Sequence, residues 1–391
     1  MTYSFDTIID RTHTLSAKYD FKAEKGMPDD VLPLWVADMD FKAPEAVTEA
    51  LQKVLDHGIY GYSDSKPEYD AAVIGWFEKR FGWAPKAEWL TKTPGVVYAV
   101  NTAVRSLTRE GDAVLIQRPV YYPFTRVIES NHRKVVNNPL VYEDGRYTID
   151  FEDFEQKIID HQVKAFILCS PHNPVGRVWT VEELTRMGEI CLKHQVKVIS
   201  DEIHCDFTYP GITHTVFANL RPEFSKNCIT CTAPSKTFNL AGLQASNIFI
   251  EDPDLRAAFR QEITASGSGG VGIMGIVSCQ AAYTHGEEWL DALKDYLKGN
   301  LDFIRDFLKE ELPQVRLVEP EGTYVVWLDF TALGLSPDDL EDLMVRKAKL
   351  WLDRGNMFGE EGEGFERFNI ACPRQTLKQA FTQLRDAVKT L

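Results

Sequence analysis

The segment Ala233-Pro234-Ser235-Lys236-Thr237-Phe238-Asn239-Leu240-Ala241-Gly242 places one lysine between a serine and a loop of small residues. Two polar residues upstream follow apolar runs: Asn173 comes soon after the run 165–169, and Asp201 directly follows the run 197–200. The interval between Asp201 and Lys236 leaves room for a crossover and a further strand of a parallel sheet. Lys236, Asp201 and Asn173 are therefore candidates for one shared site.

These side chains match the needs of pyridoxal phosphate (PLP) chemistry. The aldehyde of that cofactor bonds covalently to a lysine amine, and a desolvated, electropositive pocket favours the bond by lowering the lysine pKa. The pyridine nitrogen must stay protonated, which requires a carboxylate at the end of a buried strand. We therefore assign Lys236 to the covalent link, Asp201 to the ring nitrogen, and the side-chain amide of Asn173 to the ring hydroxyl.

Further motifs extend the pattern along the chain: PLWVADMDF (33–41), GY (61–62), TPGVV (93–97), PVYYP (119–123), DEIH (201–204) and RFNIACPR (367–374). Together with the lysine segment, and in this order, they resemble the fold-type I PLP enzymes of the aspartate aminotransferase superfamily. The resemblance is specifically to the MalY/PatB family of cystathionine beta-lyase-like carbon–sulfur lyases. Because the motifs extend over nearly the whole chain, the resemblance implies the same fold throughout.

The hydrophobic pattern independently predicts an α/β fold. The runs 113–116, 134–136, 165–169, 198–199, 228–231 and 247–250 are continuously apolar, which is typical of strands covered on both faces. Helix candidates lie between them, including 180–195, where Thr180 and Glu183 form a capping-box pattern. A long helix is expected from Glu287 until Pro313 stops it, followed by strands at 323–328 and 367–371 and a helix at 337–351.

The expected architecture is the aspartate aminotransferase-like fold type I. It combines a large domain, with a mostly parallel sheet flanked by helices, and a smaller C-terminal α/β domain. We predict an N-terminal arm at 1–45 that joins the small domain, a large PLP-binding domain at 46–285, and an interdomain helix with the small domain at 286–391.

Composition excludes several other classes of protein. The net charge of −15, without a cluster of lysine and arginine, disfavours nucleic acid as a partner. The N-terminus lacks a basic segment followed by an apolar stretch, and no window approaches the roughly eighteen apolar residues that span a bilayer, so we expect no membrane contact and a cytoplasmic protein. The seven cysteines are expected as reduced core thiols. Cys228 and Cys231 lack the second pair of a zinc site, so no metal is predicted.

The phosphate of PLP needs hydrogen-bond donors. The TPGVV motif precedes a helix expected through position 107, so the backbone amides of Gly95, Val96 and Val97 would form an anion site at its N-terminus, joined by the hydroxyl of Ser235. Many aminotransferases of the superfamily carry an arginine eight residues after the lysine, but this chain has Gln244 there. Other donors must therefore share the phosphate charge.

The resemblance also implies contacts to the cofactor and across subunits. Tyr62 resembles a tyrosine that reaches in from the partner subunit of a homodimer, and Tyr121 is expected to stack on the PLP ring. His204 occupies a position where aminotransferases usually have a tyrosine. It could brace Asp201, or it could be an ordinary buried histidine.

The amino-acid substrate brings a carboxylate, which a planar guanidinium binds through two hydrogen bonds. Arg374, at the end of the RFNIACPR motif, resembles the arginine that does this across the superfamily, and the backbone near Ala37 could complete the site. Tyr122 is expected either in the substrate pocket or in core packing.

The resemblance implies β-elimination on a sulfur amino acid such as cystathionine, with thiol, pyruvate and ammonia as products. Lys236 would take the α proton as general base, and Lys236 or Tyr121 would protonate the departing sulfur. The alternative is a PLP-dependent aminotransferase, which shares the chemistry up to loss of that proton. A secondary regulatory role in binding another protein also stays open, because the MalY-like branch includes a member that restrains a transcriptional activator.

Overall fold

The computed structural model describes residues 3–391, so the first two residues of the predicted arm lie outside the described residues. Its largest element is a seven-stranded sheet with strand order β2-β10-β9-β8-β7-β3-β4. The strand bounds are β2 (Leu90–Thr93), β3 (Ala113–Ile116), β4 (Lys134–Asn137), β7 (Ala165–Cys169), β8 (Lys197–Asp201), β9 (Cys228–Thr232) and β10 (Ser246–Phe249). β10 runs antiparallel to both of its neighbours, while β9, β8, β7, β3 and β4 pair in parallel. The predicted mostly parallel sheet is confirmed.

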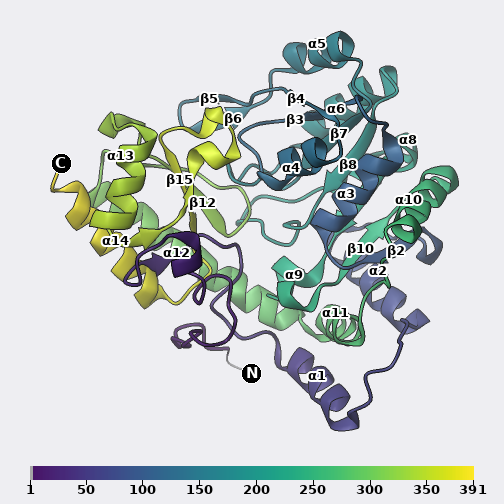
Figure 1. Ribbon diagram of the computed structural model, residues 1–391, viewed down its shortest axis with the longest axis horizontal. Coiled ribbons are helices and arrows are strands. Elements are labelled where there is room, and N and C mark those ends of the chain that lie inside the picture. The colour runs from purple at the N-terminus through teal and green to yellow at the C-terminus, as the bar shows by residue number, and fades with distance from the viewer. Residues whose placement is uncertain (1–2) are drawn as a thin grey trace.

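Side chains of this sheet alternate between two hydrophobic cores. Phe166 and Leu168 of β7 face one core, and Ile167 between them faces the other. Helices cover both faces (Figure 1), which explains why the strands are continuously apolar. One core contains residues of α3 (Val96–Leu107), α4 (Pro123–Ser130) and α10 (Pro253–Ala265); the other contains residues of α2 (Pro67–Phe81), α5 (Phe151–His161), α6 (Val181–Lys193) and α11 (Ile273–His285).

Helix α6 begins as the sequence predicts. The hydroxyl of Thr180 accepts a hydrogen bond from the backbone of Glu183, and the Glu183 side chain accepts one from the backbone of Thr180. This capping box satisfies two amide donors that a helix start otherwise leaves free. The remaining elements of the large sheet region are α1 (Glu45–His57), α7 (Phe217–Leu220), α8 (Pro222–Lys226), α9 (Pro234–Thr237) and the hairpin of β5 (Val141–Glu143) and β6 (Arg146–Thr148).

A second, antiparallel sheet follows the long helix α12 (Glu287–Glu311) in the chain. Its order is β11-β12-β15-β14, with bounds β11 (Arg316–Val318), β12 (Val325–Asp329), β14 (Asp353–Arg354) and β15 (Phe365–Asn369). Helix α12 buries Leu290, Leu293, Leu297, Leu301, Ile304 and Leu308 along one stripe, which confirms the predicted long helix. The C-terminal helix α14 (Arg374–Val388) packs against it.

The helix expected at 337–351 is wrong in its second half. Only α13 (Pro337–Asp342) is α-helical; a wider π turn follows at Leu343–Lys347, and β13 (Leu350–Trp351) is a strand. Lys349 has φ +56°, a left-handed backbone that ends a right-handed helix. The apolar residues after it are buried as a strand rather than along a helix face.

The N-terminal arm pairs with this second region. Strand β1 (Leu32–Pro33) runs parallel to β13, and Trp35 stacks on Trp351 with ring centroids 4.5 Å apart. Figure 1 shows the purple arm beside α12 and the yellow C-terminal elements. This pairing supports the predicted arm, while the domain boundaries at 45 and 285 stay predictions.

Two further properties concern the chain as a whole. All seven cysteines are free and buried. Within residues 3–391, no helix combines the length and apolarity required to cross a membrane.

Candidate active site

A cavity of about 410 Å³ opens where β7 and β8 end and α3 begins. Its walls include many of the residues predicted above: Ala37, Gly95, Val96, Val97, Tyr121, Asn173, Asp201, His204, Ser235 and Lys236. Open parallel sheets bind ligands at the carboxyl ends of their strands. The structure therefore brings the predicted lysine, carboxylate, amide and helix N-terminus together at the expected edge of the sheet.

Lys236 lies on the short helix α9, directly after β9, and points into this cavity. Its Nζ donates a hydrogen bond to the carbonyl oxygen of Ala37 at 2.6 Å. Burial, reinforced by the positive charge of Arg367, lowers the pKa of Lys236 to about 8. An amine with this pKa is neutral in a substantial fraction of molecules at physiological pH, as an attacking or proton-accepting amine must be.

Asp201 is the last residue of β8 and is only 5% exposed. The backbone amide of Ile203 donates to its Oδ1 at 3.1 Å, and no cation of residues 3–391 forms an ion pair with it. Burial raises its pKa to about 7. A buried carboxylate without a cation is costly, so this site is suited to a protonated ring nitrogen that would supply the missing positive charge.

The N-terminus of α3 forms an open anion cradle. Gly95 precedes the helix, no side chain caps it, and its first turn contains no acidic residue. The first backbone amide with a helical partner is that of Ala99, which donates to the carbonyl of Gly95 at 3.0 Å. The amides before it are thus available to a phosphate. Gln244 also lines the cavity.

Asn173 has its side-chain amide oriented by a neighbour. The Nη1 of Arg367 donates to Asn173 Oδ1 at 3.0 Å, so the amide nitrogen is the group left to donate to an incoming oxygen. This orientation fits the predicted contact to a ring hydroxyl. The site therefore fits PLP. It combines a lysine with a lowered pKa, a carboxylate without an ion-pair partner in the described chain, an amide donor and an anion cradle.

His204 is buried in the wall of the cavity, where burial lowers its pKa well below the usual value. It makes no hydrogen bond to Asp201 among the described residues; its ring packs edge-on against Tyr324 at 5.6 Å. Its Nδ1 has no partner within the described part of the chain. The geometry thus favours a neutral wall residue over a direct brace.

The structure does not bring Arg374 to this cavity. Arg374 begins helix α14 and turns toward α12, where its Nε donates to Asn300 Oδ1 at 2.6 Å beside the ring of Phe303. Gly299 leaves the space that the guanidinium occupies. Our assignment of Arg374 to the substrate carboxylate therefore conflicts with its position, because its guanidinium binds Asn300 on α12.

Arg367 is the arginine that sequence reasoning missed. It lies in β15, is 2% exposed, and donates to Asn173 and to the carbonyl oxygen of Trp35, at 2.9 Å for the latter. Asp353 forms an ion pair with it, and its Nε has no acceptor in the described structure. An arginine inside the buried strand FERFN is unusual, and this position could have indicated Arg367 as a functional residue.

Two predicted tyrosines lie outside the cavity. Tyr122 lines a neighbouring outer cleft with Arg118 and Arg126, although its ring is only 5.5 Å from that of Tyr121. Tyr62 is fully exposed and lines a groove between α1 and α11. Within one chain, neither tyrosine contributes to the wall around Lys236.

Comparison with known proteins agrees with this geometry. The family model described as aminotransferase class I and II matches residues 29–384. The chain is 46% identical to the cystathionine beta-lyase PatB of Bacillus subtilis, over 98% of this chain and 100% of PatB. It is 33% identical to Protein MalY of Escherichia coli, over 100% of both. Cystalysin from Treponema denticola, whose crystal structure contains a pyridoxal 5′-phosphate cofactor, matches with TM-score 0.96 and 40% identity over 100% of both chains.

These matches cover both sheets, the long helix α12 and every segment that lines the cavity. They confirm the aspartate aminotransferase-like fold expected from the motifs. The chain belongs to the class I and II aminotransferase family and, within it, to the MalY/PatB branch.

Proposed function

We propose that this protein is a PLP-dependent carbon–sulfur β-lyase, which cleaves cystathionine- or cysteine-type amino acids to a thiol, pyruvate and ammonia. The observation that carries the proposal is the cavity where the Lys236 amine, the Asp201 carboxylate and the N-terminus of α3 meet. The name of PatB, a cystathionine beta-lyase, supports the reaction. The pyridoxal 5′-phosphate in the structure of cystalysin supports the cofactor. The free buried thiols suit a reducing compartment, so we place the enzyme in the cytoplasm.

In this proposal Lys236 would hold PLP covalently, Asp201 would pair with its ring nitrogen, and Gly95, Val96 and Val97 would hold its phosphate. When bound, PLP would supply an electron sink that makes the α proton of the substrate removable. The Lys236 amine would be the base that takes this proton, a role to which its pKa of about 8 is suited. Burial raises the pKa of Tyr121, which keeps its proton but becomes a weaker acid, so the Lys236 ammonium that forms when the amine takes the α proton would be the stronger donor to the departing sulfur.

Arg367 takes the role of binding the substrate carboxylate. Its guanidinium is held in place by Asn173, Asp353 and the Trp35 carbonyl, and its Nε still lacks an acceptor. A carboxylate oxygen would satisfy that donor in a water-poor site, where a charge-assisted hydrogen bond is strong. Ala37, which lines the cavity, is two residues along the chain from the Trp35 carbonyl that Arg367 binds.

The reaction itself is the first test. With L-cystathionine, we expect thiol and pyruvate to appear together in equal amounts, because elimination releases both from one substrate molecule. Amino transfer to an added keto acid should be slower, by about tenfold or more. The measurement is thiol titration alongside a coupled pyruvate assay, with S-ethyl-L-cysteine as a second substrate. Fast amino transfer without pyruvate would instead establish the alternative, an aminotransferase.

We also propose a homodimer in which Tyr62 completes the site of the partner subunit. Ile59, Tyr60 and Tyr62 are exposed apolar or aromatic side chains close together in one segment. Ile59 and Tyr62 line the groove between α1 and α11, and Tyr62 lies outside the cavity around Lys236 of its own chain. A contiguous exposed patch of this kind is typical of an interface.

Subunit mixing tests this arrangement. Lys236→Ala and Tyr62→Ala chains, each inactive or weakened alone, should regain activity when unfolded together and refolded as mixed dimers. If Tyr62 acts across the interface, each mixed dimer has one intact site, so about a quarter of all sites recover. If Tyr62 acted within its own chain, no mixed site would be intact and activity would stay at the level of the separate variants.

A further inference from the structure

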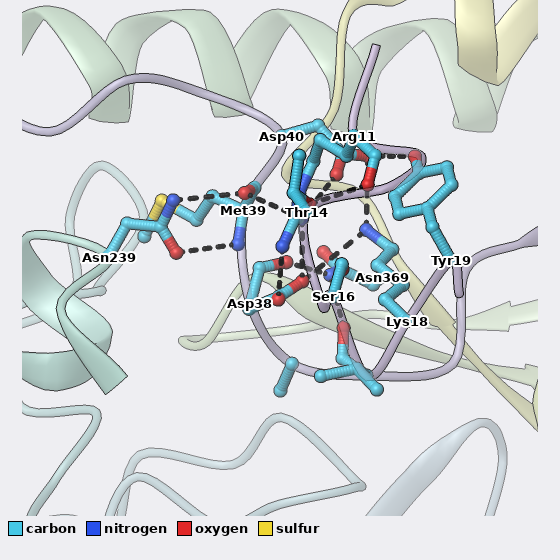
Figure 2. Close-up of polar contacts among 12 residues, drawn as sticks. Arg11, Thr14, Ser16, Lys18, Tyr19, Asp38, Met39, Asp40, Asn239 and Asn369 are labelled. Atoms are coloured by element: carbon cyan, nitrogen blue, oxygen red, sulfur yellow. Dashed lines mark hydrogen bonds and ion pairs between the residues drawn. The ribbon is translucent and has the colours of Figure 1, made fainter. Parts of the chain in front are cut away.

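Figure 2 shows a group of four charged residues, of which Lys18 and Asp40 are buried and Arg11 and Asp38 partly buried. Arg11 pairs with Asp38 and Asp40, at 2.7 Å in each case, and Lys18 pairs with Asp40 at 3.0 Å. Lys18 is 0% exposed, and the hydroxyl of Tyr19 donates to Asp40 at 3.0 Å. We call Arg11, Lys18, Asp38 and Asp40 the arm cluster. Two positive and two negative charges make it neutral overall.

The segment 36–41, which contributes Ala37 to the cavity wall, is held by the arm cluster, where Arg11 Nη1 also donates to the Met39 carbonyl at 3.2 Å, and by two asparagines. Asn369 Nδ2 donates to the carbonyls of Val36 and Asp38 at 2.6 and 2.5 Å. Asn239 Nδ2 donates to the carbonyls of Met39 and Phe41, both at 2.9 Å, and its Oδ1 accepts from the Met39 amide (Figure 2). Nearly every peptide of this segment is therefore fixed.

Those two asparagines belong to the chain segments that carry the site. Asn239 comes three residues after Lys236, and Asn369 comes two residues after Arg367. Between them, the carbonyl of Ala37 accepts hydrogen bonds from Lys236 and from the hydroxyl of Tyr324, the latter at 2.9 Å. The position of the arm is thus linked to both the lysine and the arginine of the proposed site.

The arm also acts on Lys236 through the charge of Asp38. Asp38 is adjacent to Ala37, and its charge acts on Lys236 in the direction that raises the lysine pKa, against burial and Arg367. Asp201 acts in the same direction as Asp38. Two nitrogens of Arg11 bind Asp38, so Arg11 offsets the charge of a carboxylate directly after the cavity-lining Ala37; Lys18 lies 3.7 Å from the same carboxylate.

We propose that Arg11 is a positioning residue that cancels the charge of Asp38 beside the reaction pocket and holds the Ala37 wall where the substrate carboxylate binds. The inference rests on the proposed function for the identity of the ligand. Buried ion pairs contribute little net stability but leave an expensive unpaired charge when one partner is removed. Arg11 therefore controls the field in the pocket although it does not line the cavity.

The test compares Arg11→Gln with the charge-balanced double variant Arg11→Gln/Asp38→Asn in the PLP-loaded enzyme. In Arg11→Gln, Lys18 alone faces both Asp38, at 3.7 Å, and Asp40, at 3.0 Å, so the arm cluster has an excess negative charge. This charge repels the substrate carboxylate, so KM should rise about tenfold while kcat stays within about threefold. The excess negative charge also favours the protonated form of the lysine linkage. The pH midpoint of the visible absorbance, recorded without substrate, should therefore rise by about one unit.

The double variant removes both charges and should return KM to within about threefold of wild type, together with the absorbance midpoint. The matched control is Arg221→Gln, which deletes an exposed arginine–carboxylate pair of 2.7 Å whose two residues do not line the cavity, and it should change neither quantity. An unmoved midpoint in Arg11→Gln, or a double variant as impaired as the single one, overturns the proposal. If Arg11→Gln does not fold, the double variant alone decides: a KM near that of wild type supports the proposal, and a KM about tenfold higher overturns it.

A preparation with no visible absorbance band at all would count against PLP binding, and so against the proposed function. That outcome is distinct from a normal band whose pH midpoint does not respond to Arg11→Gln. The two failures can therefore be told apart in the same spectra.

Discussion

A Lys236→Ala variant is expected to lose at least about 10⁴-fold in kcat, which corresponds to about 5.4 kcal/mol of transition-state stabilisation. The substitution removes both the amine that bonds the cofactor and the base that takes the α proton. The other residues of the cavity have no amine that could replace it. Thiol release from L-cystathionine measures the loss, and the visible absorbance of the loaded protein should change because the covalent link is absent.

Stability separates this result from simple misfolding. Burial holds the pKa of Lys236 at about 8, so the charged amine is less favourable in the folded chain than in water. Below that pH, the buried ammonium lowers the free energy of unfolding. Removing the lysine should therefore not lower the thermal midpoint of the cofactor-free protein at pH 7. Lys193→Ala, on an exposed lysine that pairs with Glu155, is the control and should keep full activity. Retention of more than about 1% of kcat by Lys236→Ala would contradict the assignment.

Much of the fold could be predicted because burial leaves a simple trace in the sequence. Strands covered on both faces, such as β7, are continuous apolar runs, and α12 has its leucines at helical spacing. The break after α13 could not be predicted, since residues 337–351 keep a helix-compatible composition. The left-handed backbone of Lys349 and the pairing of β13 with β1 depend on contacts distant in the chain.

The site was predictable where chemistry demands a residue type at the end of a strand. Asp201 and Lys236 meet that condition, and the structure brings them to one cavity. Arg367 and Arg374 occur in one motif, and spacing does not tell which guanidinium turns inward. The arm cluster left no signal, because Arg11, Lys18, Asp38 and Asp40 are charged residues that sequence composition assigns to the surface. Only the folded chain brings them together.

The choice between the two arginines leads to the second large effect. Arg367→Lys should lower kcat/KM for L-cystathionine about a hundredfold, or about 2.7 kcal/mol, although the positive charge is kept. A lysine cannot reproduce the planar fork that at once contacts Asn173, Asp353 and the Trp35 carbonyl and leaves Nε for the substrate. The same substitution at Arg374 should stay within about threefold, since that side chain binds Asn300 on α12.

A substrate analogue makes the assignment specific to the carboxylate. Wild-type enzyme should prefer an S-alkylcysteine to its α-carboxamide, because only the acid pairs with Arg367, and Arg367→Lys should lose most of that preference. If the role of Arg367 were only structural, Arg367→Lys would lower kcat/KM for both compounds equally and leave their ratio unchanged. A ratio that falls in Arg374→Lys but not in Arg367→Lys would restore the assignment first made from the motif. The guanidinium that lacks an acceptor inside the folded chain, rather than the one already bound to a helix, is the one that can discriminate between these compounds.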